Sequence, residues 1–96
     1  MARLSIVAIV KAKKDSAEFV RGELSNLVPP TRCEEGCIQY LLHQDIETPE
    51  VFVFFETWES AEHLEKHLNT DHYQRCSSAI AGMVAEKAVH RLTGIA

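Results

Sequence analysis

The stretch F-V-F-F-E-T-W-E-S-A-E-H-L-E-K-H-L-N-T-D-H-Y, residues 52–73, joins a strand pattern to a helical one. Large apolar side chains alternate through residues 51–58, as in a β-strand. Ala61, Leu64 and Leu68 then follow at the spacing of one helix face. Ser60 stands where a side chain caps a helix N-terminus. The stretch therefore predicts a strand over 51–58 followed by a helix over 61–68.

The segments on either side of this junction add a hairpin and a second helical segment. Residues 37–44 read as a strand, and the turn residues of 45–50 connect it to the strand at 51–58, which predicts a hairpin. Asn69-Thr70-Asp71 marks a break that caps a further helical segment, reaching about residue 81 and closed by Gly82.

The N-terminal part predicts a strand and a longer helix. Residues 3–13 are apolar on both alternating faces, the pattern of a strand buried on both sides. Asp15 stands three residues before Glu18, as in a capping box, and apolar residues repeat at helical spacing until Pro29-Pro30. The expected helix covers 16–28.

The last segment, residues 83–92, completes the order β-α-β-β-α-β. Its two predicted faces are Val84, Glu86, Ala88 and His90 against Ala85, Lys87, Val89 and Arg91. This order is that of the ferredoxin-like split βαβ unit, an α+β fold with a four-stranded antiparallel sheet. We expect residues 1–96 to form a single domain.

The second face of this sheet needs a cover, because both helices pack on one face while the first and third strands are apolar on both. A second copy of the chain can supply it by packing sheet against sheet, burying about 1,000 Å² or more. The sequence thus predicts a homodimer, with a ligand cavity between the sheet and the helices.

Composition argues against several partners. The net charge of −4 provides no basic field for nucleic acid or an anionic membrane. No apolar run reaches the roughly 18 residues of a spanning helix, so we expect a cytoplasmic protein. The three cysteines, Cys33, Cys37 and Cys76, fit no zinc or redox spacing and are expected to be reduced thiols.

Three motifs along the chain resemble those of the antibiotic-biosynthesis monooxygenase family, and most closely its small quinol-monooxygenase-like members. They are E-x-G-C-x-x-Y at 34–40, F-x-E-x-W-x-S at 54–60 and H-L-x-T-x-H at 67–72. The resemblance implies a dimeric α+β barrel and a cofactor-free oxidation, by dioxygen, of an electron-rich aromatic such as a quinol or an anthrone. The family also contains proteins with other chemistry.

Such a reaction needs a base to form the substrate anion and an apolar cage around it. Histidine serves as the base near pH 7, and aromatic faces stack on a planar substrate and exclude water. The candidate bases are His67 and His72, and the sequence leaves the choice between them open. His63 is expected on a solvated face. The candidate substrate-binding residues are Tyr40, Phe54, Glu56 and Trp58.

The sequence predicts neither a metal site nor a haem site. His63 and His67 have chelating spacing and could recruit His72 and Glu56, but His63 is followed by Leu64 where H-E-x-x-H has its glutamate. The resemblance to haem-degrading relatives fails because His67 stands in place of a tryptophan, Ser77 in place of a histidine, and the first strand offers no asparagine.

Two other functions remain open from the sequence. One is a non-oxidative isomerase or fragmentation enzyme of a small metabolite, which uses the same histidines and needs a cation in the pocket. Arg75, Lys87 or Arg91 could provide that cation. The other is a ligand-binding module without turnover, in which the histidines serve packing alone.

Overall fold

The computed structural model describes residues 3–96 and has the predicted order of strands and helices. Its strands are β1 (Leu4–Ala12), β2 (Cys37–Gln44), β3 (Val51–Trp58) and β4 (Val84–Leu92), and its α-helices are α1 (Ala17–Arg32), α2 (Ala61–Leu68) and α3 (Asp71–Ile80). Short 3₁₀ turns precede α1 at Lys14–Ser16 and β4 at Ala81–Met83. The strands form one antiparallel sheet in the order β2-β3-β1-β4. The ferredoxin-like α+β fold is confirmed.

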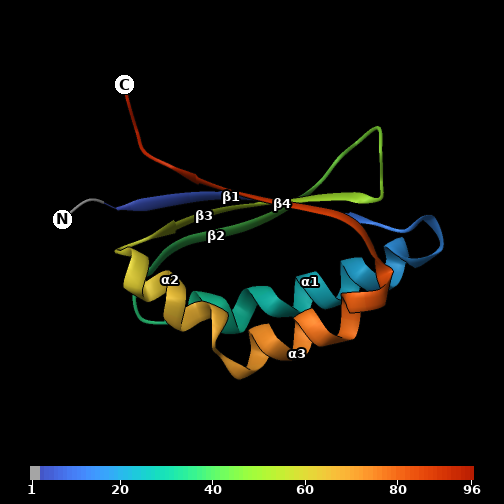
Figure 1. Cartoon of the computed structure of the whole chain (residues 1–96), viewed down its shortest axis with the longest axis horizontal. Helices are drawn as coiled ribbons and strands as arrows, with labels where there is room; N and C mark the ends of the chain where they lie inside the picture. Colours follow the sequence, from blue (N-terminus) through green and yellow to red (C-terminus); the bar gives the residue numbers. More distant parts are fainter. Residues whose placement is uncertain (1–2) are drawn as a thin grey trace.

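The three α-helices lie on one face of the sheet, and the core fills the space between the two layers (Figure 1). The central strands β1 and β3 supply most of its sheet side, with Ala8 paired to Phe54 in the middle. Every second residue of β3, from Phe52 to Trp58, is buried beneath the helices. The alternation read from the sequence therefore gives the correct inward face of this strand.

The caps of the two shorter helices agree with the sequence. The Ser60 hydroxyl accepts a hydrogen bond from the backbone N–H of His63 at 3.3 Å, which starts α2. The Thr70 hydroxyl accepts one from the backbone N–H of Tyr73, also at 3.3 Å, which starts α3. Each bond satisfies an N–H that the first helical turn leaves unpaired. The chain between α2 and α3 thus changes direction within two residues.

The predicted end of the first helix is wrong, because α1 continues through Pro29 and Pro30 to Arg32. A proline inside a helix costs about 3 kcal/mol or more through the lost hydrogen bond and the ring clash. Packing opposes this cost: Leu27 and Thr31 are buried, and the Thr31 hydroxyl donates to the carbonyl of Leu27 at 2.7 Å. The buried last turn therefore overrides a local stop signal.

The predicted capping box at the start of α1 is also wrong. Asp15 lies inside the 3₁₀ turn, and Ser16, at the cap position, accepts no side-chain hydrogen bond. The turn instead satisfies its own backbone, with the N–H of Ser16 donating to the carbonyl of Lys13 at 2.9 Å. Such 3₁₀ turns are frequent at the N-termini of α-helices.

The faces of β4 require one correction. Lys87, Val89 and Arg91 face the helices as one set, but the pairing with β1 shifts so that Ala12 pairs with Val84 after Lys11 pairs with Glu86. This bulge places two residues of one strand opposite one of the other and rotates the strand. Val84 is consequently on the helix side, not on the face of Glu86 as the strict alternation predicted.

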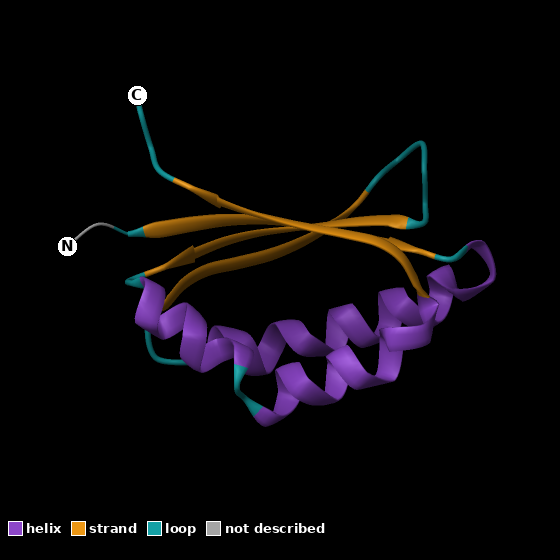
Figure 2. Cartoon of the chain, viewed as in Figure 1, coloured by secondary structure: helices purple, strands orange, loops and turns teal. Residues whose placement is uncertain are grey.

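The other face of the sheet is apolar and has no helix on it among residues 3–96 (Figure 2). Pairing sets Phe55 beside Val7 and Val53 beside Ile9, so these four side chains form the centre of this outer face. Phe55 is 45% exposed. None of the helices in the described part of the chain is both long and apolar enough to cross a membrane.

Candidate active site

A cavity of about 700 Å³ lies between the sheet and the helices. Most of its lining is aliphatic or aromatic, from β1, α1, α3 and the inner face of β3. The ionisable residues in its lining are Tyr40, Glu56, His67, Tyr73, Cys76, Lys87 and Arg91. A cavity of this size and character is typical of small-molecule sites.

His67 is the buried base candidate of this cavity. It comes from the last turn of α2 and is only 1% exposed. Its Nδ1 lies 2.8 Å from Oε2 of Glu34. An ionised carboxylate only accepts, so this hydrogen bond assigns the proton to Nδ1 and the free electron pair to Nε2, on the opposite side of the ring. Because His67 lines the cavity, Nε2 is the nitrogen available to a ligand.

Glu34 was not chosen as a site residue from the sequence, although it begins the E-x-G-C-x-x-Y motif. The extra turn of α1 delivers it to α2, because only residues 33–36 remain to connect α1 with β2. Gly36 fixes this loop: its φ is +85°, and a Cβ there would meet the His63 ring at 2.2 Å. Only glycine allows the loop to approach α2 so closely.

Aromatic rings enclose His67. Its ring centre lies 4.9 Å from Trp58, 5.5 Å from Tyr40 and 5.0 Å from Tyr73. Burial lowers the pKa of His67, and the hydrogen bond and charge of Glu34 act in the opposite direction. The imidazole is therefore neutral near pH 7 and held in one orientation, as a general base requires.

Glu56 is a second buried titratable group in the cavity lining. It projects inward from β3 and is 7% exposed. The indole N–H of Trp58 donates to its Oε1 at 2.9 Å. Burial raises the pKa of Glu56, while the Trp58 hydrogen bond lowers it. Glu56 can thus hold a proton at a higher pH than an ordinary carboxyl and can hydrogen-bond a polar atom of a ligand.

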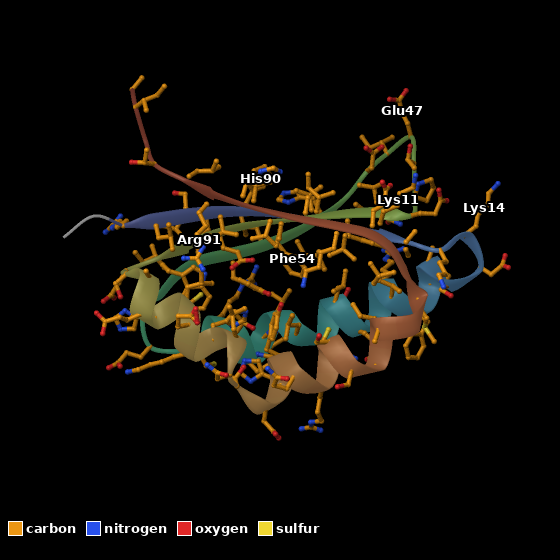
Figure 3. The ribbon with its side chains drawn as sticks, in the orientation of Figure 1. Lys11, Lys14, Glu47, Phe54, His90 and Arg91 are labelled. Carbon is orange, nitrogen blue, oxygen red and sulfur yellow. The ribbon has the colours of Figure 1, made fainter. Side chains whose placement is uncertain are left out.

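Strand β4 supplies the cations of the cavity lining, Lys87 and Arg91, and α3 places Tyr73 beside Lys87. Nζ of Lys87 donates to the Tyr73 hydroxyl at 3.2 Å and lies 5.8 Å from the centre of the same ring. Arg91 is paired with Ile6 and so shares a cross-strand row with Glu56. Figure 3 shows Phe54 and Arg91 on the helix side of the sheet and His90 on the other. Nearly all of β4 is exposed, and this edge strand contributes Val84, Lys87, Val89 and Arg91 to the cavity lining.

The structure brings together four of the six predicted site residues, since Tyr40, Phe54, Glu56 and His67 all line the cavity. The other two lie behind them. Trp58 has no exposed surface and packs behind the cavity wall against Glu56, His67 and Tyr40. His72 is on the far side of Glu34, with Nε2 2.6 Å from the same Oε2 that binds His67.

Other residues named from the sequence lie away from this centre. His63, expected on a solvated face, is only 22% exposed and bonds through Nδ1 to the Ser60 hydroxyl at 2.8 Å. Arg75 is exposed and pairs with Asp71 at 3.7 Å instead of reaching the cavity. Cys33, Cys37 and Cys76 are free thiols, and burial raises the pKa of Cys76 to about 11.

Comparison with known proteins identifies the group to which this chain belongs. The sequence is 30% identical to the probable quinol monooxygenase YgiN of Escherichia coli K12, over 93% of this chain and 95% of that protein. The crystal structure of PA3566 from Pseudomonas aeruginosa has a TM-score of 0.95 and 34% identity, covering 100% of this chain and 97% of that one.

The fold extends to more distant proteins. Rv0793 from Mycobacterium tuberculosis has a TM-score of 0.91 at 24% identity, over 99% of this chain and 97% of its own. The profile described as antibiotic biosynthesis monooxygenase matches residues 3–79, which include β1, the hairpin and almost all of α3. The chain therefore belongs to the antibiotic biosynthesis monooxygenase family.

Proposed function

We propose that this protein is a cofactor-independent monooxygenase that oxidises a small electron-rich aromatic, such as a quinol or an anthrone, with dioxygen. One observation carries the proposal: the hydrogen bond between His67 and Glu34 leaves Nε2 as a free base at the wall of a largely apolar cavity. The likeness to a quinol monooxygenase supports the same chemistry.

The first step is removal of a proton from a substrate hydroxyl or activated carbon by Nε2 of His67. Nδ1 keeps its own proton, and the imidazolium that forms is stabilised by the Glu34 carboxylate 2.8 Å away. Glu34 is thus a positioning residue, and His72 in turn binds Glu34. Of the two candidate bases, we assign the proton transfer to His67, because His72 does not line the cavity.

The substrate anion then supplies all the electrons. One electron passes to dioxygen, the two radicals combine in a C–O bond, and the O–O bond breaks with loss of water. For a quinol the balance is quinol plus dioxygen giving a hydroxyquinone plus water. The apolar lining, with Phe54 and Tyr40 on the sheet side, excludes water from the anion and accommodates a planar ring.

Tyr73 and Lys87 fit the oxygen of this anion. The Tyr73 hydroxyl accepts its hydrogen bond from Lys87, so its own O–H stays free to donate into the cavity. Donors of this kind that point at a developing negative charge stabilise it strongly in an apolar site. We assign Tyr73 to binding the aryl oxide and Lys87 to holding Tyr73 in place.

Oxygen consumption with a panel of simple quinols and anthrones tests this proposal. We expect uptake of one dioxygen per substrate, with one atom of ¹⁸O from labelled dioxygen in the product. Hydrogen peroxide is measured in parallel, since a simple oxidase reaction would release it and leave the product unlabelled. Absence of enzyme-dependent uptake across the panel would reject the monooxygenase assignment.

We also propose that two copies of the chain pack through the outer face of the sheet. Val7, Ile9, Val53 and Phe55 make the centre of that face apolar, with Leu41 and Ala88 beside them by register. A face of this kind on a small domain is normally covered, and sheet-on-sheet packing of a second copy covers it in full.

A glutamate in place of Phe55 is expected to separate the dimer. Two buried, unpaired carboxylates would face each other across the two-fold axis, which is costly. Light scattering after size exclusion should give the mass of a dimer for the wild type and of a monomer for Phe55→Glu. Ile46→Glu adds the same charge at a residue that is 97% exposed in the β2–β3 turn, and should stay dimeric. A dimeric Phe55→Glu variant would place the interface elsewhere.

A non-oxidative isomerase or fragmentation enzyme is the second candidate function. Lys87 and Arg91 in the cavity lining favour it, because they could hold the anionic group of a keto or phosphorylated metabolite. The same His67 would then shift a proton between carbons. Turnover of such a metabolite under argon, together with no oxygen uptake from quinols, would select this function over the first.

A further inference from the structure

Glu34, His67 and His72 form a cluster of a kind that binds metal ions. Each comes from a different part of the chain: the loop after α1, the last turn of α2 and the first turn of α3. One ligand atom from each lies within 4.8 Å of the other two. We propose that this cluster is a binding site for a transition-metal cation such as Zn²⁺, and that occupancy of the site silences the base at His67.

The geometry is close to that of a metal site. Oε2 of Glu34 is 2.8 Å from Nδ1 of His67 and 2.6 Å from Nε2 of His72, distances held by hydrogen bonds. Tetrahedral zinc, with ligands at about 2.0–2.2 Å, requires them to be roughly 3.3–3.5 Å from one another. Loss of the bridging protons and movements of about 1 Å are sufficient.

The surroundings suit a reversible site with one open position. The side chain of His67 is 2% exposed, that of Glu34 13% and that of His72 25%. The inner ligand is therefore fixed while the outer two are reachable from solvent, where a water can complete the coordination. Two imidazoles with one carboxylate favour zinc, cobalt or nickel over magnesium or calcium.

The pair His63 and His67, suggested by sequence spacing, does not converge in the structure. His63 is four residues before His67, but its Nδ1 bonds to Ser60 and its Nε2 lies 4.0 Å from Glu35. The group beside His67 is instead the carboxylate of Glu34, which is remote in sequence. The helix break at Asn69-Thr70 brings His72 to the same carboxylate.

Metal binding at Nδ1 and base function at Nε2 exclude each other. A neutral imidazole carries one proton, which now lies on Nδ1 and is shared with Glu34. When a cation binds the Nδ1 electron pair, that proton moves to Nε2, and the nitrogen facing the cavity becomes a donor. This consequence rests on the proposed role of His67, whereas the metal site itself does not.

Calorimetric titration of the chelator-treated, full-length protein with ZnCl₂ tests the site. We expect one Zn²⁺ per chain, and visible d–d absorption when Co²⁺ is used instead. His72→Ala and Glu34→Gln should each weaken zinc binding more than about 100-fold, beyond the loss of an outer-shell partner. His63→Ala, one turn earlier on the same helix, should bind like the wild type.

The zinc affinities of these variants distinguish the proposed cluster from other histidine sites. Absence of a stoichiometric zinc complex overturns the proposal. So does zinc binding that survives in His72→Ala and Glu34→Gln or that fails in His63→Ala, because the ion would then lie on the His63–His67 pair or on surface histidines. His72→Ala and Glu34→Gln are expected to keep the helix and the loop, so their far-UV circular dichroism should match that of the wild type.

The tautomer of His67 tests the silencing separately from activity. Long-range ¹H–¹⁵N spectra should show the Nδ1–H form without metal and the Nε2–H form with zinc. Saturating zinc should lower oxygen uptake by about 100-fold in the wild type. Zinc binding with an unchanged Nδ1–H form would overturn the silencing. A zinc-free protein that consumes no oxygen would count against the proposed oxidation alone.

Discussion

Replacement of His67 by glutamine is expected to lower kcat for quinol oxidation by about 10²–10⁴-fold, the usual contribution of a general base. Glutamine keeps the volume and a donor toward Glu34 but cannot accept a proton from the substrate. The rate is measured as oxygen uptake at saturating substrate. His63→Gln is the matched control, because His63 lies on the same helix, does not line the cavity, and should leave the rate within about twofold of the wild type. A His67→Gln enzyme that keeps the wild-type rate would remove His67 from the mechanism.

The pH profile gives an independent reading of the same residue. Burial lowers the pKa of His67 from its ordinary value of 6.5. The base is active when unprotonated, so activity is retained through pH 6.5 and lost only as the pH falls below it. Glu34 raises the pKa of His67, so Glu34→Gln should move this acid limb to lower pH as well as reduce kcat. A purely structural role of Glu34 would leave the midpoint of the limb where it is.

Truncation of Trp58 to alanine is expected to destabilise the fold by about 3–5 kcal/mol. Trp58 is completely buried and contacts Tyr40 and His67, so the substitution opens a cavity at the junction of β3 with the helices. Urea unfolding followed by circular dichroism measures the loss. Phe19→Ala removes an aromatic ring that is 49% exposed and should cost less than about 1 kcal/mol. Equal losses for the two variants would contradict a structural role for Trp58.

Trp58→Phe removes the hydrogen bond and keeps more of the packing than Trp58→Ala does. A smaller aromatic ring remains, and the carboxyl of Glu56 loses the indole N–H at 2.9 Å, a loss that should cost about 1–3 kcal/mol. This bond lowers the pKa of Glu56 against the effect of burial. We therefore expect the Glu56 carboxyl to titrate at higher pH in Trp58→Phe, as followed by ¹³C NMR. All variants are compared at one protein concentration, because the proposed dimerisation would make the measured stability depend on it.

The sequence identifies the strands, the hairpin and the starts of α2 and α3 because local rules decide them. Ser60 caps α2 as predicted, Thr70 of the predicted break caps α3, and the alternation of β3 gives its buried face. The rules fail where distant residues compete with them. The buried Thr31 carries α1 past two prolines, and a bulge opposite Ala12 turns Val84 to the helix side.

For the candidate site, the sequence by itself determined which types of functional side chain are available. It placed two histidines, a carboxylate and aromatic rings near one strand-to-helix junction, because these residues are close in the chain. It could not decide which histidine is the base, because the spacing of residues along a helix does not show which residues pack against that helix. Only the tertiary structure decided this choice. It brought Glu34, 33 residues before His67, within hydrogen-bond distance of both rings, and turned only one of them toward the cavity.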